Sequence, residues 1–232
     1  MKELNLPILS EFFGRIPCGR ALLSIYDPDS QYGSLMVNVA AGHLRAGGDL
    51  LYLISSRPVA DIRQQFSSLG VNVEEYEAKD NAVLVDVYSG QMGVKSSEKY
   101  QSRTSNLNEV SIITSESALQ WPEGTLVVVE SLSHMALNQE EVFAKFSRRL
   151  VGVWRKQGTV MIVGLAAGLH PPQFYQGMKL LSDGAFEVAL REQGGELINT
   201  IRARSMKGQR SDTRWRQILF DERMKASLRM LE

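Results

Sequence analysis

Short apolar runs alternate along this chain with stretches whose apolar residues recur at helical spacing. The runs are nearly continuous, which is the pattern of strands that are buried on both faces. They predict strands at 21–25, 50–54, 83–88, 125–129 and 159–165. The strongest prediction is the fourth strand, because Leu126-Val127-Val128-Val129 consists almost entirely of β-branched residues.

The amphipathic stretches between these runs predict helices at 33–45, 58–69, 106–119 and 138–156. Gly47-Gly48 and Gly70 follow the first two helices, where glycine commonly ends a helix. Asn138 is the predicted N-cap of the last helix, and Glu140 and Glu141 lie near the positive end of its dipole. Strands and helices that alternate in this order indicate an α/β fold with a parallel sheet covered on both faces.

The pattern changes after Asp183. Segments 185–191 and 197–204 alternate like strands and flank Gln193-Gly194-Gly195, which is a hairpin signature. Segment 214–220 predicts a third strand, and 221–231 predicts a short terminal helix. The parallel core is therefore expected to end in an antiparallel extension.

The polar stretch 89–105 holds little apolar material and predicts a surface excursion. Nothing in the chain has the composition of a linker, an internal repeat or a low-complexity tract. We therefore expect one domain over residues 1–232, with a core at about 14–190 and a basic hairpin and helix at about 191–232.

Composition argues against a disulfide-linked, membrane-spanning or secreted protein. The single cysteine, Cys18, excludes a disulfide within the chain, and we expect it to act as a small apolar residue. No run of about 18 apolar residues suggests a membrane span, and the N-terminus lacks the apolar core of a signal peptide. We expect a cytoplasmic protein that does not bind membranes.

Several segments resemble the KaiC-like branch of the RecA superfamily, above all its archaeal members. The residues are Ile16-Pro17-Cys18-Gly19-Arg20, Val85-Asp86-Val87-Tyr88-Ser89, Asn106-Leu107-Asn108-Glu109, Leu181-Ser182-Asp183-Gly184 and Met206-Lys207-Gly208. Their order and spacing, more than any one of them, carry the resemblance. It implies a RecA-like, mostly parallel sheet with helices on both faces and a C-terminal antiparallel hairpin extension.

The same resemblance directs attention to the phosphate-binding loop of the family, which follows the first core strand. Glycines let backbone N–H groups surround the phosphates there, while a lysine and a threonine contact phosphate and Mg²⁺. In this chain the segment reads Tyr26-Asp27-Pro28-Asp29-Ser30-Gln31-Tyr32-Gly33-Ser34. Tyr26, Asp29 and Gln31 replace glycines, and Tyr32 replaces the lysine. Gly33 replaces the first threonine, so only Pro28 and the Ser34 hydroxyl remain.

The catalytic positions of the family are also altered. Its glutamate pair after the second strand is replaced by Ser55-Ser56-Arg57, and its Walker B aspartate is replaced by Glu130 in Val128-Val129-Glu130-Ser131-Leu132-Ser133. Phosphoryl transfer depends almost wholly on positioning and charge neutralisation, so three altered parts argue against catalysis. We expect no catalytic residue, no metal site and no cofactor, with ATP and Mg²⁺ bound only if the altered loop still holds them.

The chain offers little other chemistry. His43, His134 and His170 have no metal-ligand spacing. Ser131, Ser133 and His134 lack a nucleophile elbow, so a structural role is expected for them. His170 lies in a loop after a late strand, in a region where α/β folds often build sites.

The C-terminal segment is the clearest positively charged feature. From Arg202 to Met230 it carries nine basic and three acidic residues, although the whole chain has 26 of each. Its candidate residues for an interface or an anion site are Arg202, Arg204, Lys207, Arg210, Arg214, Trp215 and Arg216. In ring-forming relatives this hairpin faces the neighbouring subunit, so the resemblance implies a contact between subunits. Trp215 among arginines could instead stack on a nucleic-acid base, or the segment could be a solvated face.

These observations favour a catalytically inactive pseudo-ATPase that acts as a structural or regulatory subunit. The resemblance implies that it forms a homo-oligomer, with a hexameric ring as one form, or assembles with KaiC/RecA-like paralogues. Two alternatives stay open. One is a nucleic-acid-binding module of the recombinase-paralogue type, and the other is a nucleotide sensor or weak ATPase with an unorthodox loop.

Overall fold

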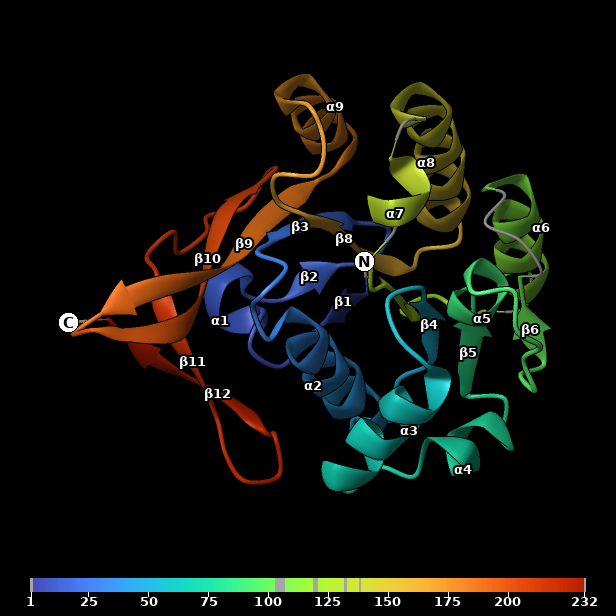
Figure 1. Ribbon diagram of the computed structural model, residues 1–232, viewed down its shortest axis with the longest axis horizontal. Coiled ribbons are helices and arrows are strands. Elements are labelled where there is room, and N and C mark those ends of the chain that lie inside the picture. The colour runs from blue at the N-terminus through green and yellow to red at the C-terminus, as the bar shows by residue number, and fades with distance from the viewer. Residues whose placement is uncertain (1, 103–106, 119–120, 132, 138, 232) are drawn as a thin grey trace.

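A computed structural model describes residues 2–102, 107–118, 121–131, 133–137 and 139–231. Its central feature is a sheet with the strand order β12-β11-β10-β9-β3-β8-β7-β4-β5-β6 (Figure 1). From β9 to β6 neighbouring strands are parallel, and from β9 to β12 they are antiparallel. The predicted fold class, a mostly parallel sheet with an antiparallel extension, is confirmed.

The strands of the parallel part agree closely with the apolar runs. They are β3 (Ala21–Tyr26), β4 (Leu50–Ile54), β5 (Ala82–Asp86), β6 (Tyr100–Gln101), β7 (Leu126–Val129) and β8 (Val160–Ala166). Side chains alternate between the two faces along each strand. Leu50, Tyr52 and Leu126 belong to one buried cluster, whereas Leu51 and Val127 belong to the other. Both faces are covered, and the runs are therefore continuous.

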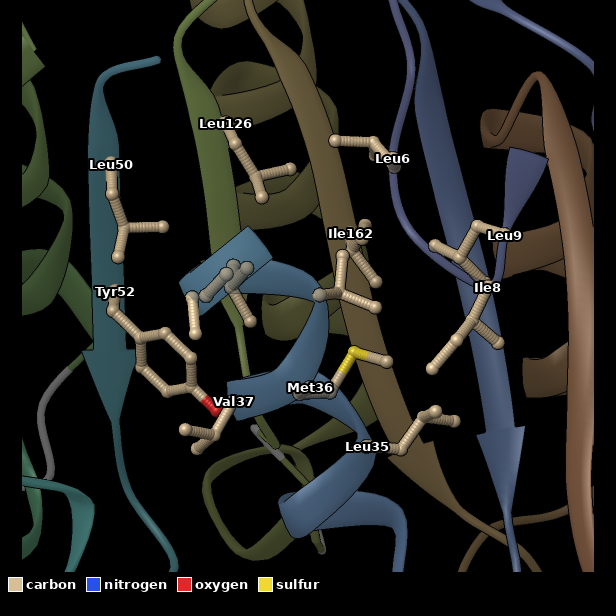
Figure 2. Packing of buried hydrophobic residues seen from close by; sticks show 14 of the residues in the cluster. Leu6, Ile8, Leu9, Leu35, Met36, Val37, Leu50, Tyr52, Leu126 and Ile162 are labelled. Atoms are coloured by element: carbon tan, nitrogen blue, oxygen red, sulfur yellow. The ribbon is translucent and has the colours of Figure 1, made fainter. Parts of the chain in front are cut away.

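Helices cover both faces of the sheet (Figure 1). One face packs against α1 (Ser10–Phe13), α2 (Tyr32–Arg45), α3 (Val59–Ser68) and α4 (Val73–Glu77). The other packs against α6 (Leu107–Ala118), α7 (Ser133–Ala136), α8 (Glu140–Lys156) and α9 (Pro172–Leu181). Figure 2 shows Leu35, Met36 and Val37 of α2 packed against Tyr52 and Ile162 of the sheet.

Some short elements were not predicted. A small antiparallel sheet pairs β1 (Glu3–Leu4) with β2 (Ile16–Pro17). The surface excursion at 89–105 contains most of α5 (Tyr88–Gln91) as well as β6. Gln139 precedes α8 as its N-cap without a side-chain hydrogen bond. The predicted cap Asn138 lies outside the described residues, as do Leu119 and Asn106.

The C-terminal extension contains β9 (Gly184–Gln193), β10 (Glu196–Met206), β11 (Arg216–Phe220) and β12 (Ala226–Met230). The prediction of a terminal helix at 221–231 was wrong. Asp221 Oδ1 instead accepts the N–H groups of Arg223 and Lys225 at 2.9 Å, which turns the chain back. The following residues then pair with β11, for example Leu228 with Ile218.

Candidate functional site

The segment expected to replace a phosphate loop joins β3 to α2 at the carboxyl end of the parallel strands, where α/β folds commonly bind ligands. The backbone N–H groups of residues 27 and 29–31 are engaged within the chain. Asp27 donates to a backbone carbonyl of β9 at 2.8 Å, and Ser30 donates to the Asp27 carbonyl at 2.9 Å. Asp29 donates to Asp27 Oδ1 at 3.0 Å, and Gln31 donates to Asn199 Oδ1 of β10 at 2.7 Å. Pro28 has no N–H, so residues 27–31 offer no unbonded backbone donor to a phosphate.

Two tyrosines fill the base of the segment. The rings of Tyr26 and Tyr32 are stacked, with centroids 4.1 Å apart and planes within 5° of each other. The Tyr26 hydroxyl donates to Ser131 Oγ at 2.7 Å. Tyr32 is fully enclosed, and burial raises the pKa of its hydroxyl well above the ordinary range, with a further contribution from Tyr26. The position that a lysine would occupy therefore carries a neutral, buried ring.

Gly164 on β8 makes room for this ring. A Cβ atom at Gly164 would lie 2.6 Å from the Tyr32 hydroxyl and 2.1 Å from the Glu130 carbonyl oxygen. Any larger residue at this position would have to displace the ring or the backbone of the segment after β7. The glycine was not identified from the sequence, because the contact joins residues distant in the chain.

Glu130, at the Walker B position, is paired inside the protein. Its Oε1 lies 2.8 Å from Arg57 Nη2, and its Oε2 accepts the Ser56 hydroxyl at 2.7 Å. The Tyr52 hydroxyl lies 3.5 Å from Oε1. The Glu130 side chain is only 2% exposed and that of Arg57 is 21% exposed. Arg57 therefore neutralises the charge of this carboxylate.

A cleft of about 520 Å³ remains beside these residues. Its lining comprises Tyr26, Pro28, Ser30, Gln31, Tyr32, Gly33, Ser34, Ser56, Arg57, Gln65, Glu130, Ser133, His134, Ala166 and Leu169. The Ser34 hydroxyl lies between two amides, because it accepts from Gln65 Nε2 and donates to Gln31 Oε1, both at 3.3 Å. The structure thus brings most of residues 26–34, together with Arg57 and Glu130, around one cleft, but Asp27 and Asp29 do not line it.

The basic C-terminal residues lie apart from this cleft, and most are paired. Arg202 Nη2 and Arg204 Nε lie 2.7 and 3.4 Å from the two carboxylate oxygens of Glu187. The guanidinium carbons of Arg191 and Arg202 lie 4.2 and 4.4 Å from the centroid of Trp215. Trp215 is thus engaged by cations of its own chain, a contact that the sequence did not reveal.

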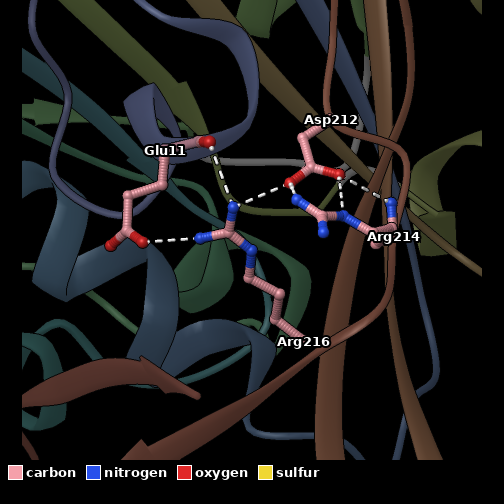
Figure 3. Close-up of polar contacts among 4 residues, drawn as sticks. All are labelled: Glu11, Asp212, Arg214 and Arg216. Carbon is pink, nitrogen blue, oxygen red and sulfur yellow. Dashed lines mark hydrogen bonds and ion pairs between the residues drawn. The ribbon is translucent and has the colours of Figure 1, made fainter. Parts of the chain in front are cut away.

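Asp212 organises the next part of the segment (Figure 3). It accepts hydrogen bonds from Arg214 and Arg216, and these bonds hold the pKa of its carboxyl well below the ordinary range. Arg216 also pairs with Glu11 at 2.7 Å. These contacts tie the hairpin extension to α1.

The remaining basic residues of the predicted set, Lys207 and Arg210, are exposed. Lys207 Nζ donates to the Leu180 carbonyl at 3.0 Å. Arg210 makes no ion pair with any residue in the described ranges. The predicted residues are thus not one continuous site but a series of separate contacts.

The three histidines are separated in the fold. His43 lies 3.1 Å from the Asp49 carbonyl, and burial lowers the pKa of its ring. His170 is enclosed beside Phe174, with Nδ1 3.3 Å from Glu140. His134 lines the cleft. Within the described ranges no cluster of three metal-ligating residues occurs, and no helix is long and apolar enough to cross a membrane.

Comparisons with known proteins agree with this architecture. A family model described as "ATPase: KaiC" matches residues 39–221, which is more than half of the chain and begins after the segment 26–34. A search of curated proteins finds no match. Among solved structures, the crystal structure of a KaiC-like protein from the hyperthermophilic archaeon Pyrococcus horikoshii OT3 is similar. It superposes with a TM-score of 0.73 at 15% identity, over 98% of this chain and 99% of that chain.

Proposed function

The chain belongs to the KaiC family of ATPase domains, and we propose that within this family it is a pseudo-ATPase that serves as a structural or regulatory assembly subunit. The observation that carries the proposal is the internal bonding of the segment 27–31. Its N–H groups are used by β9, by β10 and by the segment itself. A triphosphate bound by these backbone groups would have to replace these bonds. Asp27 and Asp29 add negative charge to the same segment, although neither lines the cleft.

The paired Glu130 supports the same conclusion. A metal ion could bind this carboxylate only after Arg57 and Ser56 had moved away. Arg57 would then lose its partner while staying mostly enclosed, which is costly for a charged group. The internal bonds of residues 27–31 and of Glu130 thus both support the proposal that nucleotide and metal binding are disfavoured.

An assembly role is supported by large apolar side chains that are exposed to solvent. Leu180 on α9 is 79% exposed, and Leu197 near the tip of the β9–β10 hairpin is 71% exposed. Exposed large apolar groups commonly mark contact surfaces when they gather in patches. A groove of about 370 Å³ between α8 and α9 adds apolar surface from Phe174, Met178 and Leu181, and the charged residues Glu140, Glu141 and Arg148 also line it.

Calorimetric titration with ATP and Mg²⁺ at low salt tests the loss of the nucleotide site. We expect no binding to the wild-type chain at millimolar ATP. A matched variant with Asp29→Gly, Gln31→Gly, Tyr32→Lys and Gly33→Thr tests whether the loop is the cause, and we expect weak binding to appear in it. Micromolar binding by the wild type, together with hydrolysis, would overturn the pseudo-ATPase proposal and favour a nucleotide sensor or weak ATPase.

Sedimentation velocity tests the assembly role separately. We expect concentration-dependent association of the wild type, and weaker association after Leu180→Gln and Leu197→Gln. Ser227→Gln, an exposed polar change on β12, is the matched control. A monodisperse monomer at high concentration, also in the presence of KaiC-like paralogues, would count against assembly.

A further inference from the structure

Figure 1 shows the turn between β11 and β12 beside the C-terminal end of α3. A pocket of about 410 Å³ lies here, at the opposite end of α2 from the cleft. It is lined by Arg45, Ser68, Leu69, Gly70, Asp221, Arg223 and Lys225. None of these residues contributes to the cleft beside Glu130.

The turn that forms one wall is held in a fixed conformation. Met224 adopts a φ of 61°, which is uncommon for a residue with a side chain. Asn38 of α2 stabilises this conformation, because its Nδ2 donates to the Met224 carbonyl at 2.8 Å and its Oδ1 accepts the Ala226 N–H at 2.8 Å. Ser68 Oγ lies 2.8 Å from the Gln65 carbonyl and 3.2 Å from the Arg223 carbonyl, so its one proton is shared between an acceptor in α3 and one in the turn. Unusual backbone conformations persist where the surroundings determine them, and they are frequent at ligand sites.

Three cations surround the pocket without a carboxylate partner. Among the described residues, Arg45, Arg223 and Lys225 form no ion pair. In contrast, Arg202 and Arg216 of the same C-terminal region are paired with acidic side chains. Arg210 and Arg229 also form no ion pair among the described residues, but they do not line this pocket, where three unpaired cations come together.

The negative groups at the pocket are already engaged. Asp221 Oδ1 accepts two backbone N–H groups of its own turn. Arg45 Nη1 donates to the Leu69 carbonyl at 2.9 Å, which satisfies one of the last carbonyls after α3. Ala46 and Gly47 donate to the last carbonyls of α2. With three cations and one carboxylate, the side chains leave a formal charge of +2 at the pocket.

We propose that this pocket binds the phosphate group of a small phosphorylated molecule through Arg45, Arg223 and Lys225. Arginine and lysine are the usual side chains that bind phosphate, and arginine can bind it through two N–H groups at once. A concave pocket with few cations suits a compact anion. A nucleic-acid strand instead needs a continuous basic groove, which the paired Arg202, Arg214 and Arg216 do not supply.

Calorimetric titration of the full chain with pyrophosphate at low salt tests the proposal. We expect saturable binding that weakens as salt is added. The double variant Arg223→Gln/Lys225→Gln should weaken binding by about 10-fold or more, because two charged partners of the phosphate are lost. Arg214→Gln removes an exposed arginine elsewhere and should leave the affinity unchanged.

The side chains of Arg223 and Lys225 are exposed and make no hydrogen bond that the structure records, so the double variant should fold. A thermal melt checks this. The proposal would be overturned by undetectable binding to the wild type, or by equal affinity in the double variant. It would also be overturned if a single-stranded oligonucleotide bound the same residues more tightly than pyrophosphate, since the partner would then be a nucleic acid.

This experiment is independent of the nucleotide test at the cleft. Binding of ATP at the cleft would depend on residues 29–33 and would be unaffected by Arg223→Gln/Lys225→Gln. Orthophosphate and a sugar phosphate, titrated in the same way, distinguish a free phosphate from a phosphorylated metabolite. Both carry the proposed group, and the tighter binder identifies the source.

Discussion

Arg57 Nη2 lies 2.8 Å from Glu130 Oε1, and this pair joins the segment after β4 to the end of β7 in an enclosed part of the cleft. The sequence resemblance led us to expect an acid at the first position and a metal-binding acid at the second. Here the two positions carry opposite charges and neutralise each other. Arg57 and Glu130 line the cleft, and their ion pair also links the segments that follow two strands of the core.

Replacing Arg57 by leucine should leave Glu130 as an unpaired, buried carboxylate. Removing one partner of such a pair typically destabilises a protein by about 3 kcal/mol or more, whereas replacing both partners with apolar residues costs far less. We therefore expect Arg57→Leu/Glu130→Leu to be more stable than Arg57→Leu alone. Urea unfolding of the wild type, both single variants and the double variant measures this coupling. If the double variant loses as much unfolding free energy as the two single variants together, the two side chains are not coupled.

Gly164→Ala and Gly152→Ala form a matched pair of substitutions. A Cβ atom at Gly164 would overlap the Glu130 carbonyl and the Tyr32 hydroxyl, and overpacking of this kind costs about 1–3 kcal/mol. Gly152 lies within α8 and has open space around the same atom, so alanine should stabilise that helix by up to about 1 kcal/mol. The melting temperature should fall for Gly164→Ala and rise for Gly152→Ala. A neutral Gly164→Ala would mean that the tyrosine stack is not tightly held.

Asn38→Ala should loosen the β11–β12 hairpin. The substitution removes the two hydrogen bonds that hold Met224 and Ala226 against α2, and lost buried hydrogen bonds cost about 1–3 kcal/mol. Hydrogen exchange of residues 216–230 should become faster, while exchange in β3 and β8 stays slow. Asn72→Ala is the control, because its side chain bonds only the nearby Glu75 on the surface. Unchanged exchange in the hairpin would indicate that strand pairing alone holds it.

The stabilising contribution of the Asp183 carboxylate should be lost in acid. Burial by itself would raise the pKa of this carboxyl, but the Ala21 N–H, Arg155 and Arg20 outweigh it, so the pKa lies below the ordinary value of 3.8. Because the folded pKa is lower than the unfolded one, the stabilisation is present above about pH 4 and is lost as the pH falls through the folded value.

Unfolding free energies between pH 2 and pH 6, a window set by these carboxyl pKa values, check this prediction. Asp183→Asn should be less stable than the wild type at pH 6, and the difference should shrink toward pH 2. A constant difference across the range would mean that the charge of Asp183 does not contribute.

The sequence by itself determined the layered core. Runs such as Leu50–Ile54 and Leu126–Val129 are apolar at every position because helices cover both faces of the sheet, and this pattern needs no knowledge of partners. The hairpin at Gly194-Gly195 was also determined locally, since both glycines have a positive φ. Through the resemblance, Tyr26 and Tyr32 could be recognised as departures from a phosphate-binding loop, and Arg57 as a departure from the glutamate pair after the second strand.

Only the tertiary structure decided what those residues do. The contact of Asn199 with Gln31, the pairing of Arg57 with Glu130 and the space at Gly164 each join residues that lie far apart in the chain. The segment 221–231 has the local composition of a helix, yet pairing with β11 and the bonds from Asn38 make it a turn and a strand. Local propensity differs by only fractions of a kcal/mol per residue, so such long-range contacts outweigh it.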